Sequence, residues 1–469
     1  MCLMKRILNK ETVKYTNKRV KVSGWVSTVR SHGKIIFIDL LDWSGVLQLV
    51  FLPKNRDVYK MIKKIRPEWV IEVEGKIAKR PKQMENPNLE TGKIELPAEK
   101  IKILSKGEAM PFSIGDDGYK IAEEKRMKYR YLDLRRERMR NNLIARQKII
   151  RFMREFLFEE GFVEVETPIL SKSTPEGARD FVVPSRLQPG KFYALPQAPQ
   201  QYKQLLQISG IERYFQIARC FRDEDPRADR QAEFTQLDIE MSFVEQDDVM
   251  NLTEKLIINL VKELYPKKKI QKVPFPRLSY KEAMKKHKTD RPDLRKNKKD
   301  SNLLAFCWVV DFPFFEKDEK GSWTFTHNPF SAPKPEFMGN LMEQKNIKSI
   351  LTTQYDIILN GVELGGGSIR NHQPEALESV FKIIGFKKEE IQQSFGHMLK
   401  AFKFGAPPHG GIAPGLDRFV MILQNESNIR EVIAFPKTGD GRDLMMDAPA
   451  EVSKEQLREL KIKSAKTKK

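Results

Sequence analysis

The chain has 469 residues, of which 40% are hydrophobic, and its formal net charge is +21. This length predicts two or three hydrophobic cores. There is no apolar run of about 18 residues and no apolar stretch of the signal-peptide type, which argues against membrane insertion and secretion. Three scattered cysteines without zinc-ligand spacing indicate a reducing compartment, so we expect a cytoplasmic protein with no membrane span. The charge favours a polyanionic partner, although it could also serve solubility alone.

Residues 1–105 are predicted to form a small β-barrel. Apolar segments alternate with turn residues, and a short helix is expected at residues 61–66. The segments are residues 20–26, 35–40, 46–51, 69–75 and 94–104. Five such strands are typical of the OB-fold. Arg30, Phe37 and Gln48 would share one face, where a cation, an aromatic ring and an amide suit unpaired bases. Phe37 would fit the barrel core equally well.

The remainder of the chain changes in pattern after a connector. Residues 106–125 are rich in glycine and aspartate, which is typical of a linker. Apolar residues at helical spacing then predict a long helix over residues 131–160, ended by Gly161. Strands and helices are mixed from residue 126 to 445, which we take as a second domain. The lysine-rich residues 446–469 are expected to form a solvated tail.

The densest polar stretch lies at residues 221–238, where eleven side chains are charged or amides. It stands between two apolar segments, residues 213–220 and 234–243. A strand, a polar loop and a returning strand predict a hairpin. Burying so many charges without partners would cost too much free energy. The hairpin is therefore predicted to face a charged substrate, in preference to being a solvated loop.

Other segments supply polar groups suited to the same substrate. Asp356 and Glu363 flank an Asn-Gly turn and offer two oxygen ligands for Mg²⁺. Two glycine-rich segments end in arginine, a composition that suits close approach of a phosphate. Each feature alone could be structural, as a glycine run can be a strand bulge. The segments are residues 174–180, a predicted mobile loop, residues 200–203, and the glycine-rich residues 365–370 and 410–418.

Together these segments resemble class II aminoacyl-tRNA synthetases, specifically the bacterial-type aspartyl-tRNA synthetases, over almost the whole chain. Motifs 1, 2 and 3 match residues 161–168, 221–238 and 411–418. The resemblance implies an α+β multidomain protein and a homodimer. An N-terminal OB-fold β-barrel at 1–105 would bind the anticodon through Arg30, Phe37 and Gln48. A hinge at 106–125 would lead to a catalytic domain at 126–445, with an antiparallel sheet flanked by helices. A basic tail would follow at 446–469.

The implied reaction joins the α-carboxylate of aspartate to the α-phosphorus of ATP, so cations must bring two anions together. Arg222 is expected between these groups. Phe234 and Arg418 would cover the two faces of adenine, and Glu363 with Asp356 would hold Mg²⁺. The resemblance thus implies ATP and Mg²⁺ as cofactors and Arg222, Glu363 and Arg418 as catalytic residues. The implied ATP-binding residues are Arg222, Asp223, Glu224, Gln231, Phe234, Glu363, Gly415, Leu416, Asp417 and Arg418.

The resemblance also implies how aspartate is selected. Lys203 and Arg370 would grip its side chain, because two cations favour a carboxylate over an amide, which would turn NH₂ donors toward them. Asp238 and Glu176 would bind the α-ammonium group, and Gln200 would help to position the substrate. The implied aspartate-binding residues are Glu176, Gln200, Lys203, Arg222, Asp238, His327 and Arg370.

Two features depart from the family pattern. The insertion domain that bacterial-type members carry between motifs 2 and 3 is absent near residues 295–303. His32 matches members that charge both tRNA-Asp and tRNA-Asn, whereas Gln83 stands where those members often have glycine. His32 therefore favours a non-discriminating enzyme with L-aspartate, tRNA-Asp and tRNA-Asn as partners.

Three alternatives stay open on the sequence alone. They are an enzyme specific for tRNA-Asp, an asparagine–tRNA ligase, and an RNA-binding paralogue without catalysis. Lys203 and Arg370 disfavour the asparagine enzyme. The presence of Arg222, Glu363 and Arg418 disfavours the paralogue.

Overall fold

The computed structural model describes residues 4–173, 177–224, 229–463 and 465. The chain divides into two compact units, Met1–Gly118 and Tyr119–Lys469, and their boundary falls within the predicted connector at 106–125. Each unit has a hydrophobic core of its own. Among the described residues, none of the helices combines the length and the apolar character that a membrane crossing requires.

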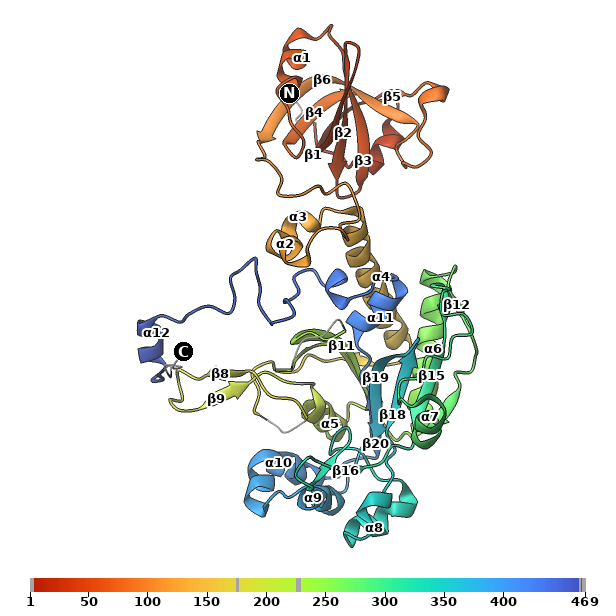
Figure 1. Ribbon diagram of the computed structural model, residues 1–469, viewed down its shortest axis with the longest axis vertical. Helices are drawn as coiled ribbons and strands as arrows, with labels where there is room; N and C mark the ends of the chain where they lie inside the picture. The colour runs from red at the N-terminus through yellow and green to blue at the C-terminus, as the bar shows by residue number, and fades with distance from the viewer. Residues whose placement is uncertain (1–3, 174–176, 225–228, 464, 466–469) are drawn as a thin grey trace. The chain divides into compact units, whose positions relative to one another are not determined.

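The first unit is a closed barrel, labelled β1 to β6 in Figure 1. Its strands follow the order β3-β2-β1-β4-β6, and a parallel pairing of β3 with β6 closes the barrel, while the short β5 extends β6. The predicted OB-fold is thus confirmed. The strands are β1 (Arg19–His32), β2 (Ile35–Asp42), β3 (Gly45–Phe51), β4 (Val70–Lys76), β5 (Ala78–Lys79) and β6 (Ile94–Ser105).

Alternate side chains of these strands fill the barrel interior, as the period-2 pattern predicts. Val20, Val22 and Val26 of β1 are buried in this core. The expected helix at 61–66 begins earlier, as α1 (Arg56–Ile62), because the Asn55 side chain accepts a hydrogen bond from Val58 N and caps the helix there. Two 3-10 turns, η1 (Lys10–Tyr15) and η2 (Lys82–Met84), complete the unit.

The second unit is built on an eight-stranded sheet in the order β13-β15-β18-β19-β20-β11-β10-β7. Neighbours run antiparallel except at the two ends, where β13–β15 and β10–β7 are parallel. Its strands are β7 (Val163–Glu164), β10 (Arg213–Phe221), β11 (Glu233–Ser242), β13 (Arg277–Ser279), β15 (Phe306–Val310), β18 (Tyr355–Leu359), β19 (Val362–Ile369) and β20 (His409–Ile412).

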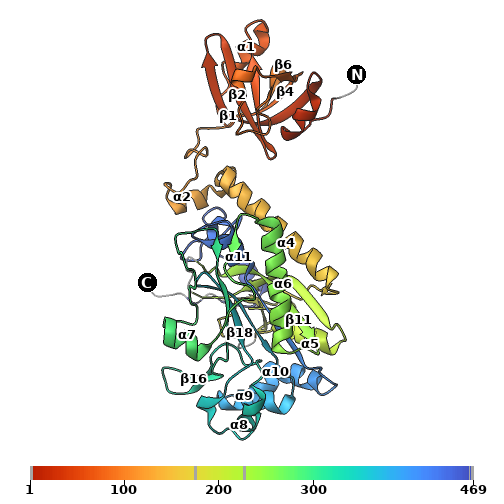
Figure 2. The ribbon, with the colours of Figure 1, turned by 90° about the vertical axis from the view of Figure 1, so that its right-hand side faces the viewer.

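Helices cover this sheet and fix its position. Apolar residues of α4 (Glu137–Glu159), α6 (Gln246–Leu264) and α11 (Leu416–Leu423) share one core cluster with strands β10, β11, β15 and β18. Figure 2 shows α4 and α6 lying against each other. A second cluster joins α9 (Pro374–Ile383) to α10 (Lys388–Phe402), which also contacts α5 (Gln200–Ile208). The antiparallel sheet flanked by helices agrees with the expected fold class.

The long helix predicted over 131–160 is interrupted. It is preceded by α2 (Glu123–Lys128), and it divides into α3 (Arg130–Asp133) and α4. Arg136 has an extended backbone with ψ of 140°, and its guanidinium Nε donates to Asp133 Oδ1 at 2.7 Å. Both side chains are fully buried. Local helical periodicity could not predict this break, because the break serves an ion pair in the interior.

A short parallel pair forms a seam between two parts of the second unit. Lys269 N and Gln271 N of the β12 (Lys269–Ile270) segment donate to Asn302 O and Leu304 O beside β14 (Leu303–Leu304). The Gln271 amide also donates to Leu294 O and accepts from Lys296 N, at 2.8 and 2.9 Å. The seam therefore flanks residues 294–304, the region where the sequence predicts that an insertion domain is missing.

The remaining elements are short. The described part of the predicted tail contains one helix, which begins at a Ser453 cap and has no buried residue. These elements are β8 (Val182–Pro184), β9 (Phe192–Ala194), α7 (Tyr280–His287), β16 (Phe315–Lys317), β17 (Trp323–Phe325), η3 (Pro335–Phe337), α8 (Met338–Met342), η4 (Ile347–Ser349), η5 (Ile429–Glu431) and α12 (Lys454–Glu459).

Candidate active site

A cavity of about 620 Å³ opens over the middle strands of the large sheet. The predicted hairpin is present as β10 and β11, paired in register from Arg213↔Met241 to Phe221↔Glu233. Because β11 pairs with β20 and β20 with β19, segments distant in sequence meet at this cavity. The predicted residues lining it are Gln200, Lys203, Arg222, Glu224, Gln231, Phe234, Asp238, His327, Asp356, Glu363, Arg370, Gly415, Asp417 and Arg418.

The glycines of β19 are required by the sheet itself. A Cβ on Gly367 would lie 2.2 Å from Gly411 O, and one on Gly365 would lie 2.5 Å from Ala413 O. These contacts are too short for any side chain. The glycine run predicted to permit close approach therefore admits a neighbouring strand, which brings Arg370 and Glu363 to the same cavity wall.

One end of the cavity holds two buried cations. Lys203 Nζ lies 2.6 Å from Asp238 Oδ1 and 3.0 Å from Glu240 Oε2. Arg370 donates twice to Glu240, at 2.8 and 3.0 Å, and once to Ser368 Oγ. None of the four ionisable groups, Lys203, Asp238, Glu240 and Arg370, exposes more than 3% of its side chain. Such burial is tolerated because each charge has an opposite partner.

Glu240 was missed by sequence reasoning, although a signal for it exists. It follows Asp238 by two positions on β11, so both side chains point to the same face of the strand. Burial opposes its ionisation, but Arg370 and Lys203 outweigh burial and lower the pKa of Glu240 to about 2. For Asp238, burial prevails over Lys203 and raises the pKa.

A second group of carboxylates lies on β18 and β19. Asp356 accepts from Gln354 Nε2 at 2.7 Å and contacts His327 Nε2 at 3.1 Å. Burial and the nearby Asp356 raise the pKa of Glu363. Burial lowers the pKa of His327, yet Asp356 outweighs it and the net shift is upward.

This carboxylate pair fits a divalent cation in its donor chemistry. Two hard oxygen donors whose like charges oppose each other are stabilised by Mg²⁺, which keeps other ligand positions for phosphate and water. Among the residues that the structure describes, no cluster of three or more His, Cys, Asp or Glu side chains could hold a metal by itself. A cation here would therefore need ligands from a bound substrate.

The hairpin end of the cavity carries aromatic and cationic groups. The Arg222 guanidinium carbon lies 5.0 Å from the centroid of the Phe234 ring, in cation–π geometry. Arg418 Nη1 donates to Glu363 O at 2.8 Å, and its Nε donates to Asp229 O at 3.1 Å. Arg418 thus links the carboxylate strand to the hairpin loop.

Gln231 has partners that the sequence did not predict. Its Nε2 donates to Lys437 O at 3.1 Å, and its Oε1 accepts from Lys437 N at 2.7 Å. Lys437 is 206 positions away, so only the folded chain reveals the contact.

Three of the predicted residues have contacts that differ from those expected for ATP binding. The Asp417 carboxylate lines the cavity but is held by Arg146 Nη1 at 2.5 Å and by Thr235 N at 2.8 Å. Leu416 packs into the main core. Asp223 pairs through its backbone with Arg179 O instead of lining the cavity. Glu176 lies outside the described residues.

Three polar atoms at the cavity wall are buried without a hydrogen-bond partner among the described residues. They are Gln200 Nε2, Asp238 Oδ2 and His327 Nδ1. Buried polar groups are almost always paired in folded proteins. These atoms therefore mark positions where a polar ligand would complete the hydrogen bonding.

The predicted anticodon residues gather on one face of the barrel in the first unit. Arg30 pairs directly opposite Phe37, which is half-buried. The Arg30 guanidinium forms two bonds to Asp39, at 2.7 and 2.8 Å, and a longer one to Gln48 Oε1 at 3.4 Å. Asp39 was not predicted, and it orients Arg30 across the strands.

The two residues predicted to affect tRNA choice are both exposed. His32 is the last residue of β1, and Gln83 lies in the 3-10 turn η2. Neither has a described side-chain contact that would assign it a structural role.

Two family models match the chain. The model for tRNA synthetases class II (D, K and N) matches residues 122–439, and the model for the OB-fold nucleic acid binding domain matches residues 20–104. The first of these matches covers more than half of the chain and contains the whole cavity described above.

Solved structures share the fold at low sequence identity. The asparaginyl-tRNA synthetase of Pyrococcus horikoshii, complexed with asparaginyl-adenylate, aligns with a TM-score of 0.76 at 21% identity, over 93% of this chain and 99% of that one. A putative aspartyl-tRNA synthetase of Leishmania major aligns with a TM-score of 0.75 at 20% identity, over 93% and 94%.

Curated relatives are much more similar in sequence. An aspartate–tRNA(Asp/Asn) ligase of Rubrobacter xylanophilus is 41% identical, over 95% of this chain and 94% of the relative. An enzyme of the same name from Chlorobaculum parvum is 42% identical, over 95% and 94%. From this identity over nearly full length, the chain belongs to the class II aminoacyl-tRNA synthetase family, in the group that its aspartate–tRNA ligase relatives form.

Proposed function

We propose that this protein activates L-aspartate with ATP and transfers the aspartyl group to the 3′ end of tRNA-Asp and tRNA-Asn. The observation that carries the proposal is the pair of buried cations, Lys203 and Arg370, at the closed end of the cavity. The names of the curated relatives, aspartate–tRNA(Asp/Asn) ligases, support the same substrates.

The hydrogen-bond donors left at these cations suit a carboxylate. An arginine has five N–H donors and a lysine has three. Arg370 uses three of its five donors on Glu240 and Ser368. Lys203 uses two of its three on Asp238 and Glu240. The unused donors can receive the side-chain carboxylate of aspartate, whereas the NH₂ group of asparagine would meet donors only.

The α-amino group has its own expected partners. Asp238 Oδ2 is buried without a partner among the residues that the structure describes, and it offers an acceptor for an ammonium group. Gln200 Nε2, a donor on the same wall, likewise has no described partner. Bound in this way, the α-carboxylate of aspartate would point along the cavity toward Arg222.

The chemical step needs positioning and charge stabilisation. An oxygen of the substrate α-carboxylate attacks the α-phosphorus of ATP, and the bond to the bridging oxygen of pyrophosphate breaks. Arg222 offsets the charge of the two anions, while Phe234 and Arg418 hold adenine between them. Glu363 and Asp356 would hold Mg²⁺, which neutralises phosphate charge when bound. In the second step a terminal ribose hydroxyl of tRNA attacks the aspartyl carbonyl and AMP leaves.

The barrel face formed by Arg30, Phe37 and Gln48 is the proposed anticodon site. Its cation, aromatic ring and amide offer stacking and edge contacts to unpaired bases. His32, at the end of the same strand, supports use of both tRNAs. The net charge of +21 favours association with RNA of either kind.

We also propose a homodimer in the cytoplasm. Apolar side chains around motif 1 are unusually exposed: Val163, Ile169 and Leu170 expose 51%, 47% and 53% of their surfaces. Exposed apolar clusters of this kind are typical of protein interfaces. Measurement of the molar mass in solution by light scattering tests the dimer, and a monomer would contradict it.

ATP–pyrophosphate exchange tests the activation step. We expect exchange that depends on aspartate and Mg²⁺, with asparagine at least about 100-fold less effective because it leaves buried cations unmatched. A Lys203→Met variant should lose this preference. A folded wild-type protein without aspartate-dependent exchange would contradict the proposed activity. A preference for asparagine would instead indicate an asparagine–tRNA ligase.

Charging of purified tRNA-Asp and tRNA-Asn in parallel tests the transfer step. We expect both to accept aspartate, with kcat/KM values within about tenfold of each other. Charging of tRNA-Asp alone would make the enzyme a discriminating one.

A further inference from the structure

We propose that an arginine–carboxylate network outside the cavity positions the adenine side of the active site, with Arg130 as its main positioning residue. The network consists of Arg126, Arg130, Asp133, Arg138, Glu426 and Glu431. The inference rests on the proposed function, because it concerns how the cavity binds ATP.

The segment that the network holds is residues 426–438, which follow α11. Its only regular structure is the 3-10 turn η5, so its shape depends on contacts with other elements. One of its residues lines the cavity, and another holds a cavity residue, Gln231. Ile429 lines the cavity wall, and the backbone of Lys437 binds both amide atoms of Gln231. The position of this segment therefore sets the position of Gln231.

Arg130 binds the backbone of this segment directly. Its Nη2 donates to Arg430 O and Ile433 O at 2.5 and 2.8 Å, and its Nε donates to Ala434 O at 2.9 Å. The guanidinium is 3% exposed, and Asp133 neutralises it at 2.8 Å. Three backbone carbonyls thus converge on one planar cation. The last of them, that of Ala434, lies three residues before Lys437. A lysine ammonium, as a single point, cannot reproduce this fork.

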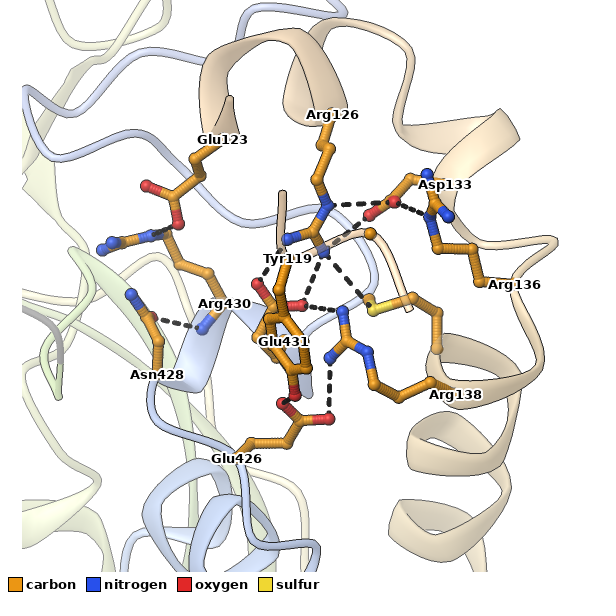
Figure 3. Close-up of polar contacts among 12 residues, drawn as sticks. Tyr119, Glu123, Arg126, Asp133, Arg136, Arg138, Glu426, Asn428, Arg430 and Glu431 are labelled. Carbon is orange, nitrogen blue, oxygen red and sulfur yellow. Dashed lines mark hydrogen bonds and ion pairs between the residues drawn. The ribbon is translucent and has the colours of Figure 1, made fainter. Parts of the chain in front are cut away.

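The side chain of Glu431 holds the same segment in place, as Figure 3 shows. Its carboxylate accepts from Arg126 at 3.0 and 2.6 Å and from Arg138 at 2.8 Å. Burial opposes its ionisation, but Arg126 and Arg138 outweigh burial and lower its pKa. The contact therefore stays charged at neutral pH.

Glu426 anchors the start of the segment to the same helix region. It accepts from Arg138 Nη1, from Asn142 Nδ2 and from the Tyr119 hydroxyl, each at 2.7 Å. Asp133, in turn, accepts from Arg126 at 3.0 Å. Residues 119–142 thus hold residues 426–434 through charge-assisted bonds, although about 300 positions separate them in sequence.

These bonds end on the segment that supports Gln231, and none of the network residues lines the cavity. The network therefore acts on the nucleotide only through the segment. A small shift of a supporting loop is enough to change activity by about tenfold or more.

The experiment compares Arg130→Lys with the wild type in ATP–pyrophosphate exchange. We expect KM for ATP to rise about tenfold, while KM for aspartate changes by less than about twofold. Adenosine should become a weaker inhibitor by a similar factor, and inorganic tripolyphosphate should inhibit as before. This contrast isolates the adenine side from the phosphate side.

Glu254→Gln is a matched control for stability alone. Glu254 is a buried carboxylate on α6 that accepts from Trp308 Nε1 and Phe275 N, at 2.8 and 3.1 Å, away from the cavity. This variant should lower the melting temperature without raising KM for ATP. Glu431→Gln is the second test variant, and it should repeat the effect of Arg130→Lys in a milder form.

An unchanged KM for ATP in a folded Arg130→Lys protein would overturn the proposal. If both Arg130→Lys and Glu431→Gln fail to fold, the network serves the stability of the fold, and the proposal is also overturned. Absence of aspartate-dependent exchange in the wild type is a separate result, because it contradicts the proposed function instead.

Discussion

Glu363 is a residue of the cavity whose ionised form is unfavourable in the folded protein without ligand. Burial and Asp356 raise its pKa above the ordinary value of 4.5. A carboxyl whose pKa is raised on folding binds its proton more tightly in the folded state. The ionised form therefore destabilises the fold without ligand, and this cost grows as pH rises above 4.5 until it is complete above the folded-state pKa.

Glu363→Gln should therefore stabilise the protein while abolishing its activity. At pH 7.5 without nucleotide, we expect the melting temperature to rise by about 1–4 °C, because the amide carries no charge. Near pH 4 the gain should vanish, since the wild-type carboxyl is then protonated. Thermal scans at both pH values, with exchange assays, check this. Glu378→Gln, at a partly exposed position outside the cavity, is the control. A lower melting temperature for Glu363→Gln at pH 7.5 would contradict the argument.

Residue identities at the site were predicted where motifs carry them, but their partners were not. Lys203 and Arg370 could be named from sequence, whereas the carboxylate that joins them, Glu240, could not. Strand alternation shows that Glu240 faces the same way as Asp238, yet it does not show which cations face it. Similarly, Asp417 was predicted to bind ATP, while its carboxylate is engaged by Arg146 and Thr235 N. Its role toward ATP stays a prediction.

At the scale of elements, three parts of the catalytic unit meet at Asp417. Asp417 lies in the first turn of α11, and its carboxylate binds Arg146 of α4 and accepts from a backbone N–H of β11. The residue next to that N–H is Phe234, which lines the cavity. The contacts of Asp417 therefore join helices α4 and α11 to strand β11 of the hairpin.

Asp417→Ala should weaken this junction. We expect a loss of about 2 kcal/mol in unfolding free energy, from two charge-assisted hydrogen bonds that leave Arg146 unpaired. The midpoint of urea unfolding and the exchange rate are the measurements, and both should fall. Arg151→Ala removes an exposed i,i+4 pair with Glu155 and should change stability by less than about 0.5 kcal/mol. Equal effects of the two variants would refute the role given to Asp417.

Elements with strong periodicity were predicted well, and those set by distant contacts were not. The barrel strands and the β10–β11 hairpin follow from alternation and from turn residues. The network around Glu431 depends on partners about 300 positions away in sequence. The break between α3 and α4 depends on an ion pair, Asp133 with Arg136, whose burial is set by the surrounding tertiary packing. Such pairings carry no local signal, so no reading of one segment could have produced them.

At the scale of the whole molecule, the chain has two units with separate cores. The cavity residues all belong to the second unit, and the proposed anticodon face belongs to the first. Amino-acid activation and tRNA reading are therefore expected to be separable.

A protein consisting of residues 119–469 should test this separation. We expect it to fold and to retain aspartate-dependent exchange within about threefold of the full chain, because its core and cavity are complete. Its kcat/KM for tRNA should fall by about 100-fold or more, because one of two linked binding surfaces is lost. Exchange and charging assays on both proteins are the measurements. Undiminished tRNA charging would contradict the assignment of the barrel face.

The seam at β12 and β14 has a consequence for how such a chain can change length. The alignment with the Rubrobacter relative runs over 569 positions, 100 more than the 469 residues of this chain. Gln271 holds Leu294 and Lys296 beside the strand pair, so the chain enters and leaves this region at points already fixed to each other. A closed junction of this kind lets a whole domain be gained or lost with little disturbance to the catalytic unit. It is therefore a natural place to attach a reporter or a foreign domain to the enzyme.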